Sequence, residues 1–367
     1  MHPAVRRLAY SLTRQIDGAL LGIVLALVAL GLVVLVSASN LNAARVTGQA
    51  ANILIALGLL WLFANIPPHY LMRLALPLYV LGLLLLVAVA LFGDVVHGAR
   101  RWLDLGVTRI QPSEFMKIAV PLALAWYFDR HEKTLRLGNY AVAVVLLLIP
   151  VGLIARQPDL GTAVLITAAG FFVLFLAGLP GRVIAGLAIA AAAALPLVWS
   201  ALRDYQRQRI LTLFDPSQDP LGSGYHTIQS MIAVGSGGWF GKGWLNGSQT
   251  HLDFIPERTT DFVFAVFAEE FGLLGCLLLL GLYLAAISRG MLITANAPTM
   301  FARLLCGAIT LTFFTYAFVN MGMVSGILPV VGVPLPFISY GGTALASICL
   351  GFGILMSVNS HKKLVQT

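Results

Sequence analysis

Apolar residues in the chain gather in ten long runs instead of alternating with polar residues. The runs lie near 17–36, 50–66, 72–92, 113–128, 139–156, 161–179, 182–200, 262–288, 301–325 and 338–358. A helix needs roughly 20 consecutive apolar residues to cross a bilayer, and most of the runs approach that length. The pattern predicts an all-α polytopic membrane protein with ten transmembrane helices. The fourth run is the least apolar, because it contains Glu114 and Lys117.

The longest polar stretch, 201–260, separates the seventh run from the eighth. It contains aromatic and aliphatic residues among its glycines and charges, which is typical of an ordered functional loop. Short helices are expected in it, one of them amphipathic at 227–234. The whole chain, 1–367, is therefore expected to form a single integral membrane domain with 201–260 as its one large loop.

Composition supports the membrane assignment. The chain has 59% hydrophobic and only 10% charged residues, with a mean hydropathy of +0.90, whereas soluble domains carry about 25% charged residues. This excludes a soluble globular enzyme, a disordered chain and a small disulfide scaffold. The cysteines Cys276, Cys306 and Cys349 lie in apolar runs without zinc-ligand spacing, so they are expected to pack as small hydrophobic residues.

The formal net charge of +8 is explained by membrane topology, because lysines and arginines in short loops face the cytoplasm. With both termini in the cytoplasm, 12 of the 23 basic residues lie on that side, Lys117 lies in a span, and five of the ten on the outer side fall in the long loop. Both termini are therefore predicted to be cytoplasmic and the long loop extracytoplasmic, and no nucleic-acid partner is expected. Most acids fall on the outer half, which suggests that a function there uses carboxylates.

Ionisable residues within or beside the apolar runs are candidates for chemistry. Glu114 and Lys117 share one helix face and either neutralise each other or face a functional cavity. Asp159 follows Gln157 and a proline, so it either caps the next helix or serves a site. Asp261 opens the eighth run, where it either caps that helix or meets a substrate with a polar head and a lipid tail.

Three further features have two interpretations each. Glu269 and Glu270 lie roughly 12–14 Å beyond Asp261 along a helix, and they either lock helices together or bind a ligand. The glycine-rich segment 235–243 departs from the Walker pattern, so it is either a flexible turn or a phosphate site formed by main-chain amides and Lys242. The segment 332–342, which contains Ser339, is either an interfacial turn or the wall of a pocket.

The motifs of the chain resemble those of the shape, elongation, division and sporulation (SEDS) family. The resemblance rests on Gln-Pro-Ser-Glu at 111–114, Gln-Pro-Asp-Leu-Gly at 157–161, the segment 215–225, Pro-Glu at 256–257 through Asp-Phe-Val-Phe-Ala at 261–265, and 336–342. These match in order over nearly the whole chain. Gly-Lys-Gly-Trp at 241–244 and Val-Val-Gly-Val-Pro at 330–334 are similar to the elongation branch, not the division branch.

The resemblance implies ten transmembrane helices, with a large extracytoplasmic loop between the seventh and eighth. It also implies a peptidoglycan glycosyltransferase that polymerises lipid II into glycan strands on the outer face of the bacterial cytoplasmic (inner) membrane. The essential aspartate of the family corresponds to Asp261, and its polar cavity residues correspond to Arg109, Glu114, Lys117, Gln157 and Asp159. Family members often carry a histidine two residues before the aspartate, where this chain has Thr259.

The expected chemistry is an inverting transfer with Asp261 as general base on the C4 hydroxyl of lipid II. Attack on the anomeric carbon of the undecaprenyl diphosphate-linked glycan releases undecaprenyl diphosphate, and inversion needs no covalent intermediate. Arg109, Lys117 and Lys242 are candidates to meet the charge of the diphosphate, and a divalent cation, Mg or Mn, is a further possibility. No resident metal site is expected.

Two other functions fit part of the sequence. A lipid II flippase would also place charges inside spans, but a transporter site is expected near the midplane between repeats. A scaffold for a transpeptidase would leave the carboxylates without a role. The resemblance implies a class B penicillin-binding transpeptidase and the elongation machinery as partners.

Overall fold

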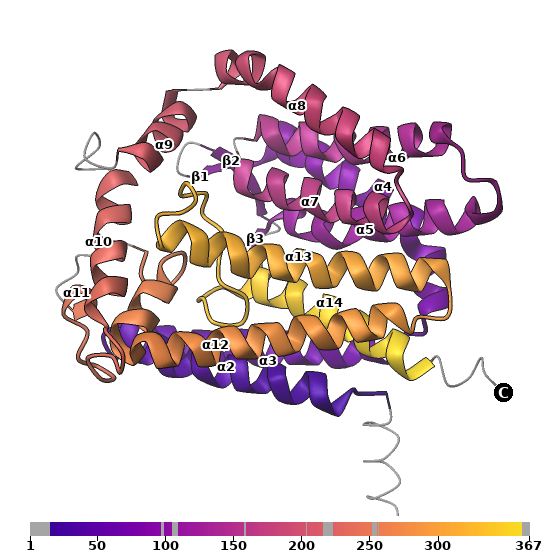
Figure 1. The fold of residues 1–367 in the computed structure, drawn as a ribbon. Coiled ribbons are helices and arrows are strands. Elements are labelled where there is room, and N and C mark those ends of the chain that lie inside the picture. The colour runs from indigo at the N-terminus through magenta and orange to yellow at the C-terminus, as the bar shows by residue number, and fades with distance from the viewer. Residues whose placement is uncertain are drawn as a thin grey trace, which may run out of the picture.

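The computed structural model describes residues 15–361 except 97–98, 105–108, 158, 203, 216–222, 252–254 and 256. Each of the ten apolar runs forms a helix (Figure 1). These helices are α2 (Gly18–Ala38), α3 (Ala43–Ala64), α4 (Pro68–Phe92), α5 (Pro112–Arg130), α6 (Leu137–Arg156), α7 (Leu160–Leu176), α8 (Gly181–Ala201), α12 (Val263–Ala295), α13 (Met300–Val324) and α14 (Gly342–His361).

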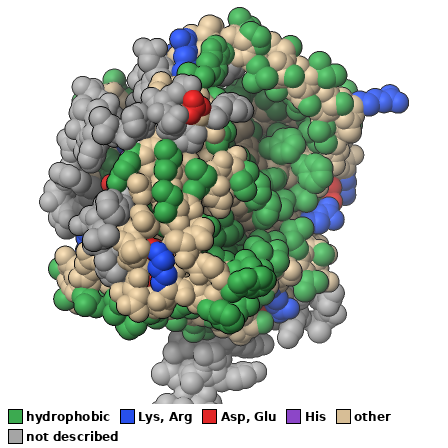
Figure 2. All heavy atoms as spheres, turned by 60° about the vertical axis from the view of Figure 1, so that its left-hand side comes forward, with side chains coloured by type: hydrophobic (Ala, Val, Ile, Leu, Met, Phe, Trp, Pro, Cys, Tyr) green, Lys and Arg blue, Asp and Glu red, His purple; other side chains and the backbone are tan. Residues whose placement is uncertain are grey.

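Seven of these helices are long and apolar enough to cross a membrane, which confirms an all-α polytopic fold. The other three fall short for different reasons: α7 and the apolar part of α8 are shorter, while α5 carries Glu114, Lys117, Asp129 and Arg130. The number of ten crossings therefore stays a prediction. Hydrophobic side chains gather over large areas of the described surface in Figure 2, as expected where a bundle contacts lipid.

The long loop contains the expected short helices. They are α9 (Asp204–Phe214), α10 (Ser223–Ser236) and α11 (Ser248–His251), and α10 includes the predicted segment 227–234. A 3-10 turn, Glu132–Thr134, joins α5 to α6. One feature was not expected: β1 (Asp94–Val96), β2 (Ala99–Asp104) and β3 (Arg109–Ile110) form a small antiparallel sheet of order β1-β2-β3 between α4 and α5. These strands and α9–α11 lie at the left-hand end of the bundle in Figure 1.

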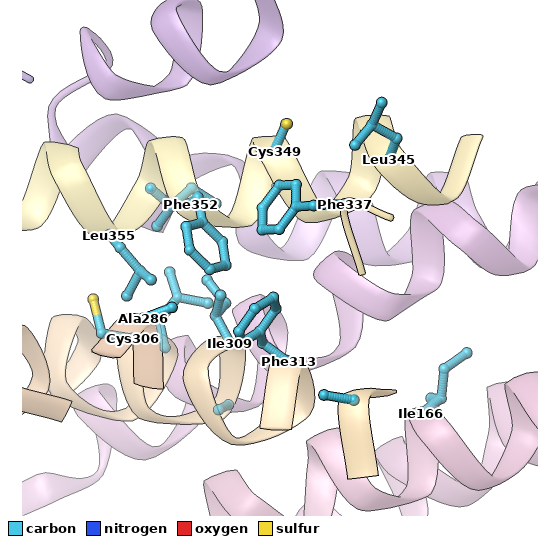
Figure 3. Packing of buried hydrophobic residues seen from close by; sticks show 14 of the residues in the cluster. Ile166, Ala286, Cys306, Ile309, Phe313, Phe337, Leu345, Cys349, Phe352 and Leu355 are labelled. Carbon is cyan, nitrogen blue, oxygen red and sulfur yellow. The ribbon is translucent and has the colours of Figure 1, made fainter. Parts of the chain in front are cut away.

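The segment 325–341 between α13 and α14 is not helical, so the last helix begins at Gly342 and not near 338. It is anchored in the core by Phe337, whose ring lies 5.8 Å from that of Phe313 and 5.2 Å from that of Phe352, centroid to centroid. Figure 3 shows these rings together between α13 and α14. Phe337 has a φ of 65°, and packing of this kind holds a side chain in that strained region.

α12 extends seven residues beyond its predicted end and is interrupted near its middle. Gly272 has φ 63° and ψ −163°, which breaks the helical hydrogen bonds there. The loop before α11 replaces them: the main-chain N–H groups of Lys242 and Gly243 donate to the carbonyls of Glu269 and Glu270, and Leu273 N–H donates to Gly238. A glycine loop therefore pins the outer part of α12 in place.

Candidate functional site

Four helices begin around one cavity at the same end of the bundle. The first turns of α5, α7 and α14 and the residues just before α12 line a space of about 270 Å³. The first N–H groups of a helix have no partner within it, and the helix dipole adds partial positive charge at that end. Helix N-termini grouped around one space favour a ligand with negative charge, such as a phosphate group, although the end of α7 is already capped by Asp159.

The cavity brings together five of the eight residues predicted for the site: Asp261, Glu114, Lys117, Asp159 and Ser339. Other polar or aromatic residues share the lining, and they are Arg101, Trp102, Gln111, Thr162, Thr260, Phe337, Tyr340 and Thr343. Both signs of charge therefore meet in one water-accessible space, surrounded by a bundle that is otherwise apolar.

Asp261 does not act as the cap of α12. The N-cap position is Phe262, and no side chain caps the helix there. Asp261 instead lies in the turn before the helix, partly exposed to the cavity. Its Oδ2 faces the wall opposite, since a Cβ placed on Gly332 would lie 3.3 Å from that oxygen. Of the two interpretations of this aspartate, the structure supports a carboxylate that faces a cavity.

The structure agrees with both interpretations of Glu114 and Lys117: they form an ion pair, and they line the cavity. Lys117 Nζ lies 2.5 Å from Glu114 Oε1, so the two charges largely neutralise each other. The pair also lines the cavity, where Ser347 Oγ donates to Glu114 Oε2 at 3.2 Å. Lys117 lies 5.0 Å from the ring centroid of Tyr316, a cation–π distance. Lys117 therefore supplies little net positive charge to a ligand.

Asp159 caps α7 and serves the cavity at the same time. Its Oδ1 accepts from the N–H of Thr162 at 3.3 Å, and its Oδ2 accepts from Gln111 Nε2 at 3.1 Å. A guanidinium nitrogen of Arg101 lies 4.0 Å from Oδ1. The predicted residue Gln157 is buried beside this group, where its Nε2 donates to the carbonyl of Leu86 at 3.1 Å. Gln157 is not part of the cavity lining described here.

Ser339 belongs to the segment 325–341, which forms one wall of the cavity. Its hydroxyl donates to the carbonyl of Thr260 at 2.6 Å and accepts from the N–H of Leu335 at 2.8 Å. The N–H of Tyr340 donates to the carbonyl of Thr259 at 2.8 Å. The wall is therefore bonded to the two residues that precede Asp261, and the interpretation of this segment as the wall of a pocket agrees with the structure.

Lys242 lies elsewhere. Its Nζ pairs with Glu269 Oε1 at 2.7 Å and donates to Ser248 Oγ at 2.8 Å, and it is not among the residues that line the cavity. Glu269 and Glu270 are fully buried in the same cluster, with Glu270 accepting a hydrogen bond from Ser37 on α2. These acids thus lock the loop and two helices together. The glycine segment 235–243 is an ordered turn.

The last residue predicted for the site is Arg109. Its main chain belongs to β3, but its side chain lies outside the described residues. Sequence reasoning missed Arg101, Trp102 and Gln111 as lining residues. A signal for Arg101 was present: two adjacent arginines in a short loop that is predicted to lie outside run against the positive-inside rule, so the predicted topology alone does not explain them.

Comparison with known proteins agrees with this arrangement. The chain matches the family model described as cell cycle protein (FtsW, RodA, SpoVE) over residues 18–364. It is 50% identical to peptidoglycan glycosyltransferase MrdB of Escherichia coli K12, over 96% of this chain and 95% of that protein.

Two solved structures share the fold. One chain, from a study of the structural coordination of polymerization and crosslinking by a peptidoglycan synthase complex, has 37% identity and a TM-score of 0.83 over 96% of this chain and 99% of that chain. The crystal structure of the rod shape determining protein RodA of Thermus thermophilus has 32% identity and a TM-score of 0.72, over 94% and 97%. The chain therefore belongs to the FtsW/RodA/SpoVE family, the SEDS family that its motifs resemble, and within it to the RodA type.

Proposed function

We infer that the chain is a peptidoglycan glycosyltransferase and propose that it polymerises lipid II with Asp261 as general base. The observation that carries the proposal is the position of Asp261: its carboxylate faces a cavity of mixed charge onto which four helix N-termini converge. A site for a sugar diphosphate needs a base next to an anion-binding surface, and this cavity provides both.

In the proposed reaction, Asp261 takes the proton from the C4 hydroxyl of the incoming sugar. The oxygen then attacks the anomeric carbon of the growing strand, the bond to the diphosphate breaks, and undecaprenyl diphosphate leaves with the electron pair. An α-linked donor gives a β-1,4 bond by inversion, so a single base is sufficient and no covalent intermediate forms. Asp261 returns its proton to water in the cavity.

The charge of the leaving diphosphate must be met within the cavity. Arg101, whose nearest contact with Asp159 is 4.0 Å, and the N-terminal ends of the helices supply positive charge, whereas Lys117 is paired closely with Glu114 at 2.5 Å. Among the described residues, no group of three His, Cys, Asp or Glu side chains is placed to hold a metal. The residues present fit a Mg or Mn ion only if the substrate supplies most of the ligands, with Asp159 as a protein ligand. Such an ion would supply the remaining positive charge.

The proposal also covers the position of the cavity in the membrane and the partners of the chain. The cavity lies on the outer side of the bacterial inner membrane, with both termini in the cytoplasm, because the basic residues of the short loops favour that orientation. A class B penicillin-binding transpeptidase and the elongation machinery are the proposed partners. Similarity to a chain of a peptidoglycan synthase complex supports the first of these.

The test uses the purified full-length chain in detergent with fluorescently labelled lipid II, where no second compartment exists. Wild-type protein is expected to yield glycan polymer, and Asp261→Asn at least about 10²-fold less. Glu132→Gln is the matched control, because it also neutralises one carboxylate but lies exposed in the turn between α5 and α6. Labelled lipid II left unpolymerised by the wild type would support a transporter, and full activity of Asp261→Asn would exclude this base.

A further inference from the structure

We propose that Asn320 is a positioning residue for this glycosyl transfer. Its side-chain amide holds the main chain of Asp261 against the wall 325–341 and so fixes where the base stands. The inference rests on the proposed role of Asp261, and it concerns a residue that does not line the cavity.

Asn320 lies on α13 and is completely buried, with an exposed fraction of 0%. Its Nδ2 donates to the carbonyl of Asp261 at 2.8 Å and to the carbonyl of Val333 at 2.7 Å. A side-chain amide nitrogen has two N–H donors, and both are used. Because both partners are carbonyl oxygens, the orientation of the amide is determined by its hydrogen bonds.

The two carbonyls belong to the two sides of the site. Asp261 carries the base, and Val333 follows Gly332, where an added Cβ would lie 3.3 Å from Asp261 Oδ2. A shift between these two segments would therefore change the surroundings of the carboxylate directly. Ser339 and Tyr340 hold Thr260 and Thr259 in the same way, but both also line the cavity. Asn320 holds Asp261 itself and is out of reach of a substrate.

The other amide atom argues against a purely structural role. Asn320 Oδ1 is buried and has no hydrogen-bond partner within the part of the chain that the structure describes. A buried acceptor without a partner destabilises a fold, so an apolar side chain would suit this position better if packing alone mattered. The asparagine is explained instead by the two hydrogen bonds that it donates to Asp261 and Val333.

Two variants separate loss of the donors from loss of packing. Asn320→Ala removes the whole amide, and Asn320→Asp keeps its shape but removes both N–H donors. A displacement of a catalytic group by about 1 Å costs roughly 10²-fold in rate. Both variants are therefore expected to lower kcat for lipid II polymerisation by about 10²-fold, with KM changed less than about threefold because no contact with substrate is lost.

The decisive measurement is a double-mutant cycle with Asp261→Asn. If Asn320 acts through Asp261, then Asn320→Ala should change the residual rate of the Asp261→Asn protein by less than about threefold, since residues that act as one unit are not additive. A residue that only stabilises the fold would lower the rate by the same factor in both backgrounds. Thr310→Val is the control: it removes a buried hydrogen bond on α13, from Thr310 to Cys306, and should leave kcat unchanged.

The outcomes separate the two proposals. Wild-type kcat in folded Asn320→Ala and Asn320→Asp, with Asp261→Asn impaired, overturns the role of Asn320 and leaves the role of Asp261 intact. Equal losses in both backgrounds also overturn it. Full activity of Asp261→Asn overturns the base and the positioning role together.

Discussion

Two groups of carboxylates lie within one short stretch of the chain and have opposite surroundings. Asp261 faces the cavity, with Glu114 and Asp159 on the helices opposite. Glu269 and Glu270 follow it by eight and nine residues on the same segment, but both are fully buried. The difference lies in their surroundings: Asp261 borders a cavity, whereas Glu269 and Glu270 are enclosed by residues of the long loop and of α2.

Glu269 is saturated by its neighbours. Its two oxygens accept hydrogen bonds from Lys242, Ser248, Thr250 and the N–H of Gln249. An ionised carboxylate offers about four lone-pair positions, so none remains for a ligand. Asp261, in contrast, has its carboxylate at the edge of a space of about 270 Å³. An acid deep in a membrane protein is thus a site residue only when the fold leaves room beside it.

The largest expected effect is a loss of activity, which distinguishes Asp261 from the buried pair Glu269 and Glu270. Asp261→Asn is expected to lower polymerisation of lipid II by at least about 10²-fold, the range lost when a general base is removed. Its unfolding temperature in detergent should stay within a few degrees of wild type, because the side chain faces the cavity. A large loss of thermal stability together with activity would mean that Asp261 belongs to the locked group instead.

The second expected effect is a loss of thermal stability, which distinguishes the buried Glu269 from Asp261. Glu269→Ala leaves the N–H and the hydroxyl of the buried Thr250 without their acceptor, and a buried donor left unsatisfied costs about 1–3 kcal/mol. Glu269→Ala should therefore unfold in detergent at a clearly lower temperature than Asp261→Asn. An unchanged unfolding temperature in Glu269→Ala would contradict the locked assignment.

Periodicity and composition predicted what depends on local sequence. The ten helices, α10 in the long loop and the cap at Asp159 all follow from runs, lengths and N-cap preferences that a short window contains. Of the six residues that the family resemblance implied for the cavity, the structure places Asp261, Glu114, Lys117 and Asp159 around one cavity. Gln157 lies beside that cavity, and the side chain of Arg109 is outside the described residues.

Pairings between distant segments could not be predicted in this way. Lys242 was expected near the substrate because glycines surround it, but it pairs with Glu269, 27 residues away. No local pattern encodes that contact, since it depends on how the loop returns to the broken helix. The strands β1–β3 were missed for a related reason: two to six residues are too few to show an alternating pattern.

A smaller effect is expected at the break in α12, which follows both Asp261 and the pair Glu269 and Glu270 along the chain. Gly272 has a positive φ, and a Cβ there would lie 2.3 Å from the nitrogen of Gly241. Gly272→Ala is therefore expected to destabilise the protein by about 1–3 kcal/mol and to lower activity in part, because the segment above the break carries Asp261. Gly281→Ala is the control on the same helix, where a Cβ would meet nothing within 4 Å. Equal unfolding temperatures for the two variants would show that the break carries no strain.

The smallest effect concerns a third locked carboxylate, at the opposite end of α12. Arg289 Nη2 lies 2.5 Å from Asp17 Oδ2, and Asn359 donates to the same oxygen at 2.7 Å. Burial alone would raise the pKa of Asp17, but the hydrogen bonds from Arg289 and from the main chain at Leu20 outweigh it and hold the pKa below its usual 3.8.

A lowered pKa means that the native state favours the charged carboxylate. The contribution of Asp17 to the free energy of unfolding is therefore complete above pH 3.8, and it is lost as the pH falls through the lower pKa of the native state. Asp17→Asn should therefore be less stable than wild type by about 1 kcal/mol at pH 7, a modest value because Arg289 is partly exposed. Thermal unfolding across the pH range should show the difference shrinking below pH 3.8. A difference that stays constant down to pH 3 would mean that the charge of Asp17 plays no part, and that a carboxylate can be locked by shape alone.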